Sequence, residues 1–499
     1  MIDIAANLSN INHLSKIFCT SILNLQCKQL VDYCGYYSKS GVSELTMIMQ
    51  KRFSEMSYKG ALFLSRKLRD MPPYVALMLL AVITGLLTGA CAFLLKMSVR
   101  WVSTLFTSHF QSDGANWALL VLPIAGIMFT GIYQRYILHK EIYHGTERLN
   151  NAIAHRRYRL AGDLTYAPMI ASTLTLGFGG SAGAEGPIAY TGAAIGSNIG
   201  KAFRVSPGMM KVMLACGASA GIAGIFKAPV GGVLFSLEVL SIGLSAHACV
   251  ALFLSSLSAS LTSFVLSGCT TDLVFHNVVP LSMDWMPWVI LLGIFCGLYS
   301  FYYSAVMSHL KRWYYSMKNP WMMNLVSGSI LAVLVFIFPP LFGEGYGFMS
   351  DVLAGDMKAF SAYSLFAGDA SGLYTPILIA SGIIAVKAFA CVSSNSGGGV
   401  AGDFAPTLMA GCVAGFFFVS LLNLSFGKVL PVGNFSFFGM AAVMAGAVRA
   451  PFMAIFITVE MAQAYSMILP VAVAAAVSYL CVLLLRRLFR MNLALPKSY

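Results

Sequence analysis

The sequence predicts an all-α polytopic membrane protein, a bundle of tilted and broken helices built from two related halves. The 499-residue chain is 58% hydrophobic and only 10% charged, a balance that excludes a soluble globular protein of this length. It contains apolar runs long enough to cross a bilayer core, which takes about 20 helical residues. Its landmarks recur after 219 or 222 residues, and such duplication is typical of membrane transport folds.

The chain divides into an extension, a membrane domain and a tail. Residues 1–56 are an N-terminal extension of unknown role, and residues 57–71 are expected to form a basic amphipathic helix at the membrane interface. The membrane domain is expected at residues 57–490, with repeats at about 74–266 and 286–488. Residues 491–499 form a short C-terminal tail, so we expect no cytoplasmic regulatory domain.

Two kinds of apolar run make up the domain. Uninterrupted runs predict simple spans at residues 74–97, 117–137, 288–307, 324–342 and 469–485. Runs interrupted by glycine and proline cover residues 169–200, 209–266, 361–392 and 405–426. A broken backbone is tolerated at membrane depth only where it is buried in protein or lines a polar cavity. The interrupted runs therefore predict the transport path.

The net charge of +13 comes from short basic segments that flank the apolar runs, such as residues 51–69 and 486–497. By the positive-inside rule both termini face the cytoplasm. Membrane topology explains this charge better than a nucleic-acid partner, so no nucleic acid is expected. The 11 cysteines are scattered without paired spacing, which favours small apolar residues in helices over a metal site or disulfides.

Charged residues are sparse inside the domain, which draws attention to Glu185. It is the only charged residue between Asp163 and Lys201. An ionisable side chain at membrane depth is a functional candidate because its ionised form is costly there. The second repeat has no glutamate at the matching position, where Phe404 stands.

Glu238 and Glu460, by contrast, occupy the same position in the two repeats. This symmetry favours a structural role for both. Each is expected either to pair with the nearby Lys227 or Arg449, or to hydrogen-bond to helix ends.

Two glycine-rich turns, at residues 177–187 and 393–406, predict broken helices whose ends face each other. Neither has the Gly-Lys-Ser/Thr ending of a nucleotide-binding loop. Glycine lets a helix break and proline suits the first turn of a new one. The new helix exposes N–H groups at its positive dipole end, which can hold a small anion. Glycines that only allow close helix packing explain Gly192 and Gly196 well, but not the glycine, serine and proline crowded together beside a lone carboxylate.

Glu185 beside such a site predicts a gate. When ionised, its side chain is itself an anion and can occupy the site; when protonated or displaced, it leaves the path open. Proton binding and anion binding are then linked.

These residues resemble the CLC family of chloride channels and proton/chloride antiporters over about residues 60–490. The segment Gly183-Ala184-Glu185-Gly186-Pro187 is similar to the family's gating motif, and residues 402–406 resemble its Gly-x-Phe-x-Pro motif. The resemblance implies an inverted-repeat fold and a homodimer with one pore per subunit. It also implies Glu185 as the gate and an anion path along the backbone of Gly183, Ala184, Gly186, Asp403, Phe404 and Ala405.

The chain departs from the family pattern around the anion path. Ala184 stands where a basic residue is usual. The family's serine-containing turn falls at residues 143–147, where His144 lies near the serine position and Thr146 offers the nearest hydroxyl. His144 fits a plain loop role at least as well as a ligand role. Tyr499 is the only candidate for the family's anion-contacting tyrosine.

Another departure concerns the proton path. Antiporters of the family often carry a second, inward-facing glutamate, and the alignment places Val239 there beside Glu238. This favours a passive chloride channel, with a proton-coupled antiporter as the alternative because some antiporters lack that glutamate. A membrane-embedded enzyme would need a His, Asp or Glu cluster such as His-Glu-x-x-His, and the spans contain none. We expect no cofactor, chloride or a similar small anion as cargo, and the inner membrane of a prokaryote as the location.

Overall fold

The computed structural model describes residues 71–489 apart from 109, 111–115, 143–144, 244, 272, 274, 276–278, 281, 362–373 and 428–429. The predictions for the N-terminal extension, the interfacial helix up to residue 70, the C-terminal tail, His144 and Tyr499 lie outside the described residues. The described chain is helical, as predicted, and its one β-type pairing is an isolated bridge.

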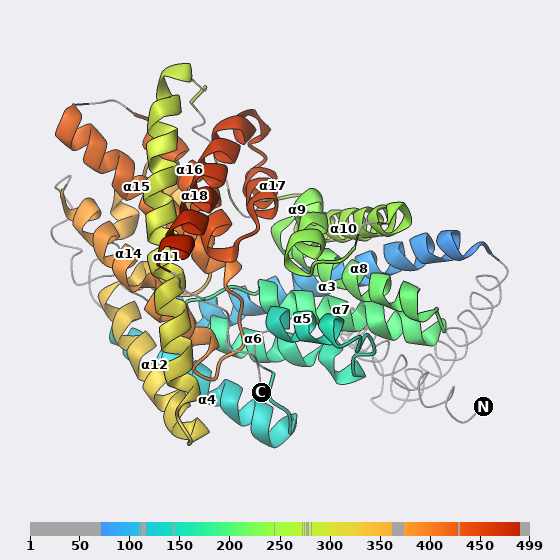
Figure 1. Ribbon diagram of the computed structural model, residues 1–499. Coiled ribbons are helices and arrows are strands. Elements are labelled where there is room, and N and C mark those ends of the chain that lie inside the picture. Colours follow the sequence, from blue (N-terminus) through green and yellow to red (C-terminus); the bar gives the residue numbers. More distant parts are fainter. Residues whose placement is uncertain are drawn as a thin grey trace, which may run out of the picture.

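Both repeats are series of helices joined by short connections (Figure 1). The helices of the first repeat are α3 (Pro73–Thr107), α4 (Leu122–Ile132), α5 (Gly145–Ala154), α6 (Ala167–Gly177), α7 (Glu185–Ala202), α8 (Pro207–Phe226), α9 (Pro229–Leu234) and α10 (Ala246–Leu266). Those of the second are α11 (Met286–Tyr315), α12 (Pro320–Ile337), α13 (Tyr346–Ala354), α14 (Tyr374–Asn395), α15 (Phe404–Phe426), α16 (Val432–Val448), α17 (Pro451–Met461) and α18 (Ile468–Leu488). Short 3-10 or π turns complete them at Trp117–Leu120, Tyr133–Ile137, Gly162–Thr165, Phe235–Val239, Met283–Trp285, Pro339–Leu341, Met357–Phe360 and Tyr465–Met467.

Nine helices among the described residues are long and apolar enough to cross a bilayer. They contain four of the five predicted simple spans in full, and the fifth, predicted at residues 324–342, is α-helical only up to Ile337. The interrupted runs break as predicted at two places: residues 169–200 divide into α6 and α7, and residues 209–266 divide into α8, α9 and α10. The run at residues 405–426 is instead a single helix, α15. Its Gly411 and Gly415 lie where a Cβ would meet the backbone of α16, so they serve packing and do not break the helix.

The repeats place equivalent helices in equivalent packing. Helices α17 and α18 begin 222 residues after α9 and α10. Helix α7 packs along α8, and α15 packs along α16 in the same way. A Cβ on Gly192 would lie 2.1 Å from Gly217 O, and one on Gly411 would lie 2.3 Å from Gly439 O. The expectation that Gly192 serves close helix packing is confirmed.

The repeats are inverted with respect to each other. Gly183 and Gly402, which match at a displacement of 219, form an antiparallel bridge with each other. Equivalent residues can pair in this antiparallel sense only across a twofold axis, so the axis passes through the bridge. Helices also cross between the halves: α4 of the first repeat packs on α12 of the second, and α9 packs on α17. Figure 1 shows α4 beside α12 at the lower edge of the view.

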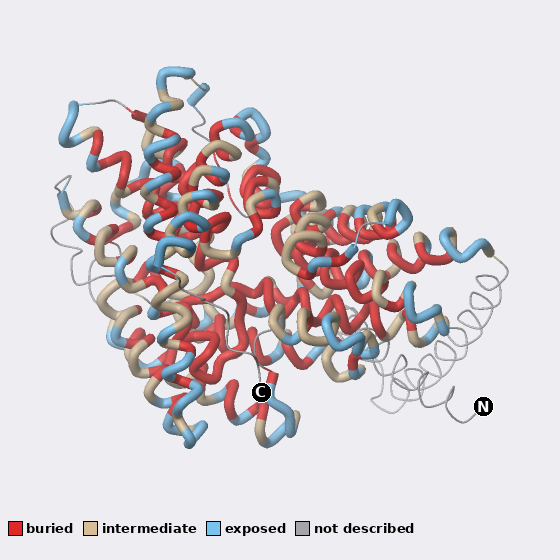
Figure 2. The backbone as a smooth tube through the Cα atoms, viewed as in Figure 1, coloured by how far each residue is buried: buried red, intermediate tan, exposed pale blue. Residues whose placement is uncertain are grey.

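Buried residues concentrate on the helices next to this axis (Figure 2). Helices α7, α8, α15 and α16 are buried along most of their length. The outer helices expose large apolar side chains, for example Leu261 on α10 and Leu484 on α18. Exposed apolar faces of this size suit lipid. The polar breaks between the central helices are thus enclosed by protein, as a membrane requires.

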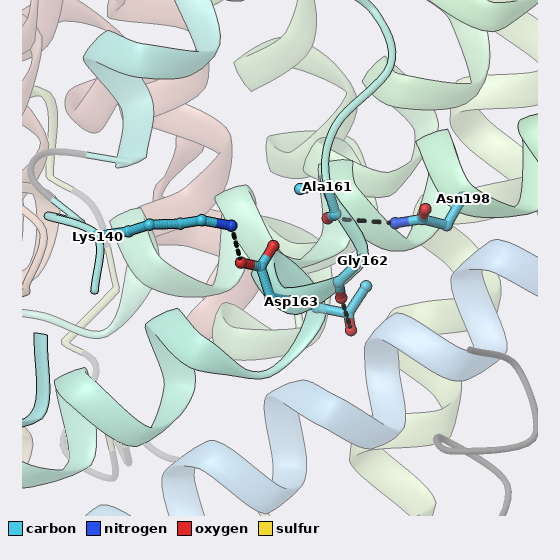
Figure 3. A network of polar contacts seen from close by, with 6 residues as sticks. Lys140, Ala161, Gly162, Asp163 and Asn198 are labelled. Atoms are coloured by element: carbon cyan, nitrogen blue, oxygen red, sulfur yellow. Dashed lines mark hydrogen bonds and ion pairs between the residues drawn. The ribbon is translucent and has the colours of Figure 1, made fainter. Parts of the chain in front are cut away.

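A polar network holds the segment between α5 and α6 against α7 (Figure 3). The Lys140 ammonium lies 2.5 Å from the Asp163 carboxylate, and Asn198 of α7 donates a weak 3.5 Å hydrogen bond to Ala161 O. The hydrogen bond with Asp163 raises the pKa of Lys140, which lies outside the spans. Lys140 therefore stays charged and adds to the basic character of this loop.

Candidate functional site

The site is formed where two helices break and restart. The chain leaves α6 at Gly177 and restarts at α7, and it leaves α14 at Asn395 and restarts at α15. Gly179 (φ +98°) and Gly398 (φ +112°) adopt left-handed backbone conformations that favour glycine. These glycines let the chain reverse direction inside the protein.

The two breaks are hydrogen-bonded to each other across the twofold axis. Gly183 N–H donates to Gly402 O at 3.0 Å, and Gly402 N–H donates to Gly183 O at 2.6 Å. Ser181 N–H donates to Ser394 Oγ at 2.8 Å. Val400 N–H donates to Thr175 Oγ1 at 3.0 Å. These bonds satisfy buried backbone groups that the helix breaks expose, and they fix the helix starts opposite each other.

Glu185, the first residue of α7, reaches across to the start of α15. Its Oε1 accepts a hydrogen bond of 3.0 Å from Ala405 N–H, in the first turn of α15. The residue is fully buried. Its Oε2 has no hydrogen-bond partner from another described residue. A carboxyl group thus occupies the helix N-terminus at which the sequence predicts an anion.

Glycines make room for this carboxyl group. A Cβ on Gly183 would lie 2.0 Å from Glu185 Oε2, and a Cβ on Gly402 would lie 2.8 Å from it. On the opposite helix, a Cβ on Gly186 would meet Gly402 Cα at 3.2 Å. Side chains at these positions would displace the carboxyl group or separate the two helix starts.

A second carboxylate, Glu344, covers the start of α7. Its Oε1 accepts a 3.1 Å hydrogen bond from Ala184 N–H, and it interacts electrostatically with Glu185. Glu344 lines a cavity of about 620 Å³ together with Lys96, Arg100 and Asp351. Lys96 also interacts with Glu185 electrostatically, so charges of both signs from this cavity act on Glu185.

Asp403, the residue just before α15, turns toward α14 and away from the cavity. Its Oδ1 accepts hydrogen bonds from Asn395 Nδ2 and, at 3.6 Å, from Cys391 Sγ. The next side chain, Phe404, is buried and packs edge-on against Phe235 at 5.8 Å between ring centroids. The sequence predicts that Asp403 contributes its backbone to the anion path. In the structure its titratable side chain lies just before α15 and binds α14.

Lys387 supplies a positive charge that sequence reasoning did not single out. It lies on α14, is fully buried and donates a 2.9 Å hydrogen bond to Ser181 Oγ. Ser181 belongs to the first glycine-rich turn, so this ammonium group lies beside the breaks. A buried cation near a helix-end site adds attraction for an anion.

Thr146 lies in the first turn of α5 and is partly buried. Its neighbour Glu147 forms an ion pair of 2.6 Å with Lys311 of α11. An ion pair therefore lies next to Thr146, whose hydroxyl group is a predicted anion ligand. The described residues contain no group of three or more His, Cys, Asp or Glu side chains that could hold a metal ion.

Val239 and Glu238 end the π turn that follows α9. Val239 packs against the core and has no titratable group. Both carboxylate oxygens of Glu238 accept from α17, at 3.3 Å from Phe452 N–H and 2.7 Å from Met453 N–H. Of the two structural roles expected for Glu238, the bond to a helix end is the one that forms.

The chain matches known proteins over most of its length. The model of the family described as "Voltage gated chloride channel" matches residues 125–483. An H(+)/Cl(-) exchange transporter ClcA of Klebsiella pneumoniae is 27% identical over 420 residues, which cover 81% of this chain and 85% of the relative. A ClcB-like chloride channel protein of Ralstonia nicotianae is 25% identical over 381 residues, which cover 73% of this chain and 82% of the relative.

Solved structures agree with the fold. A slow cyanobacterial Cl-/H+ antiporter gives a TM-score of 0.69 at 22% identity, over 86% of this chain and 100% of the other. A CLC-type fluoride/proton antiporter gives a TM-score of 0.64 at 25% identity, over 81% of this chain and 95% of the other. The prediction of an inverted-repeat helical membrane fold is confirmed.

Proposed function

Because the chain belongs to the voltage-gated chloride channel family, we propose that it exchanges chloride for protons through a path gated by Glu185. The family match makes it a multi-pass anion transport protein. The sequence alone favoured a passive channel, with proton coupling as the alternative. Relatives that are named exchange transporters and antiporters support the alternative better.

The observation that carries this proposal is the hydrogen bond from Ala405 N–H to Glu185 Oε1. The start of α15 can hold one anionic group at a time, and here the group is a carboxyl on the opposite repeat. Chloride reaches Ala405 N–H only when that carboxyl leaves, so chloride and the ionised side chain compete for one site.

Protons enter through the same competition. A protonated Glu185 carries no charge and loses most of its attraction to the helix dipole, so it yields the site to chloride. Chloride binding in turn favours the displaced, protonated side chain, because the coupling between two ligands is reciprocal. The amides of Phe404 and Ala405 then form the anion-binding centre. Gly183, Ala184 and Gly186 line the path on the facing helix.

Chloride-driven proton uptake tests the proposal. Purified protein is placed in liposomes under an outward chloride gradient, and the external pH and chloride are recorded together. Exchange predicts proton uptake that stops when the gradient is removed. Chloride efflux without proton movement would leave the channel as the function.

We also propose a homodimer in the inner membrane of a bacterium, with both termini in the cytoplasm. The family resemblance supports the dimer, and the basic segments at both ends of the domain support the orientation. The mass of the detergent-solubilised protein measured by light scattering tests the dimer. Protease access to a tag at each terminus in sealed vesicles tests the orientation.

A further inference from the structure

Two carboxyl groups lie at the start of α15, one from each repeat. Glu185 comes from α7 and binds Ala405 N–H. Asp403 comes from the same chain segment as α15 and occupies its cap position, two residues before Ala405. A change of charge on either group therefore acts on the same helix end.

The two carboxyl groups face different surroundings. The charged groups that act on Glu185 are Glu344 and Lys96, which line the cavity at α3 and α13. Those that act on Asp403 are Lys311 of α11 and Glu147 of α5. The two groups therefore interact with charges on different helices.

Asp403 and Glu185 differ in how far they are buried. Asp403 is partly exposed and Glu185 is fully buried. Both hydrogen bonds that the structure gives to the Asp403 side chain end on Oδ1. Neither of these bonds uses Oδ2, so this oxygen can carry a proton.

Polar groups around Asp403 come from α14, α11 and α5. Cys391 and Asn395 lie on α14, and Tyr303 of α11 interacts electrostatically with Asp403. Lys311 is itself paired with Glu147 at 2.6 Å. Charges of both signs thus act on Asp403.

We propose that Asp403 is the second proton carrier of the exchanger. It accepts the proton that Glu185 releases and passes it to water beside the Lys311–Glu147 pair. One O–H bond breaks at Glu185 and one forms at Asp403, and no redox step occurs. This role rests on the proposed exchange of chloride for protons.

Chloride and proton fluxes measured together in liposomes test the role of Asp403. We expect Asp403→Asn to lower the ratio of protons taken up to chloride released at least tenfold relative to the wild type. Asp403→Glu, which restores a carboxyl group, should recover proton uptake. Asp351→Asn makes the same chemical change at a carboxylate of the opposite cavity, and it should leave the proton-to-chloride ratio unchanged.

The outcomes separate the two proposals. A wild-type protein that moves no protons overturns the exchange function itself. A wild-type protein that couples, together with an Asp403→Asn variant that couples equally well, overturns the role of Asp403 alone. If Asp403→Asn does not fold, Asp403→Glu still decides: proton uptake with an unchanged pH profile would count against Asp403 as a carrier.

Discussion

Glu238 and Glu460 form a symmetric pair of carboxylates, whereas Glu185 and Asp403 break the symmetry between the repeats. Glu238 binds Phe452 N–H and Met453 N–H at the start of α17. Glu460 binds the N–H groups of residues 230 and 231 at the start of α9, at 3.2 and 2.9 Å. Each repeat thus caps a helix of the other, which ties the halves together.

The second pair is unequal. Helix α15 is capped from the other repeat by Glu185, but α7 is capped by Glu344 from a loop of the second repeat. Asp403 turns to α14. The two pairs differ in how their oxygens are used: Glu238 and Glu460 each use both oxygens on backbone amides, whereas Glu185 uses one, and its Oε2 has no hydrogen-bond partner among the described residues.

Removing the titratable proton of Glu185 should have the largest effect on transport. In Glu185→Gln the amide oxygen can still accept from Ala405 N–H, so the fold is kept. We expect chloride-driven proton uptake to fall at least about 100-fold and the remaining chloride flux to lose its pH dependence. Liposome flux measured from pH 4 to pH 8 checks this. Anion flux that kept its full pH dependence would rule out the gate.

Widening the contact between the two helix starts should have the next largest effect. A Cβ in Gly402→Ala would lie 2.6 Å from Gly186 N, so the backbone must shift. Overpacking of this kind costs about 1–3 kcal/mol. A change of that size in the free energy of chloride binding alters the binding constant by about 5- to 150-fold. Chloride binding measured by calorimetry should weaken accordingly. Gly208→Ala is the control, because no atom lies within 4 Å of its Cβ. Unchanged chloride affinity in Gly402→Ala would contradict the proposed geometry.

Local sequence patterns predicted the framework well. The breaks near Gly179 and Gly398 follow from glycine and proline spacing, which acts on the backbone within a few residues. The symmetric placement of Glu238 and Glu460 also predicted their structural role, because a twofold arrangement gives equivalent residues equivalent partners.

Contacts between distant segments could not be predicted in the same way. Glu344 lies 160 positions from Ala184, and Lys311 lies 164 positions from Glu147, so no spacing rule relates them. Sparse charge, the signal that marked Glu185, also marks Lys387 and Asp403 within the second repeat. Asp403 was expected only to supply a backbone amide. The direction of its side chain depends on α14 and α11, which sequence does not place.

Breaking the symmetric pair should reduce stability without affecting coupling. Glu460→Ala leaves two N–H groups of α9 without their carboxylate, and Glu238→Ala does the same at α17. Each loss should cost about 1–3 kcal/mol, with the larger cost at Glu460 because it is more deeply buried. Thermal unfolding in detergent measures the cost. An altered ratio of protons to chloride in either variant would give these glutamates a functional role and erase the distinction between the pairs.

The smallest effect is expected at Glu344, which completes the asymmetric arrangement. In Glu344→Gln the amide oxygen can still accept from Ala184 N–H, so only the negative charge near Glu185 is removed. A partly exposed charge contributes up to about 1 kcal/mol, so chloride should bind about two- to fivefold more tightly. Asp351→Asn removes a charge from the same cavity without touching a helix end and should change affinity less. Equal effects in the two variants would mean that Glu344 acts only through the general charge of the cavity, and that its bond to α7 has no special part in gating.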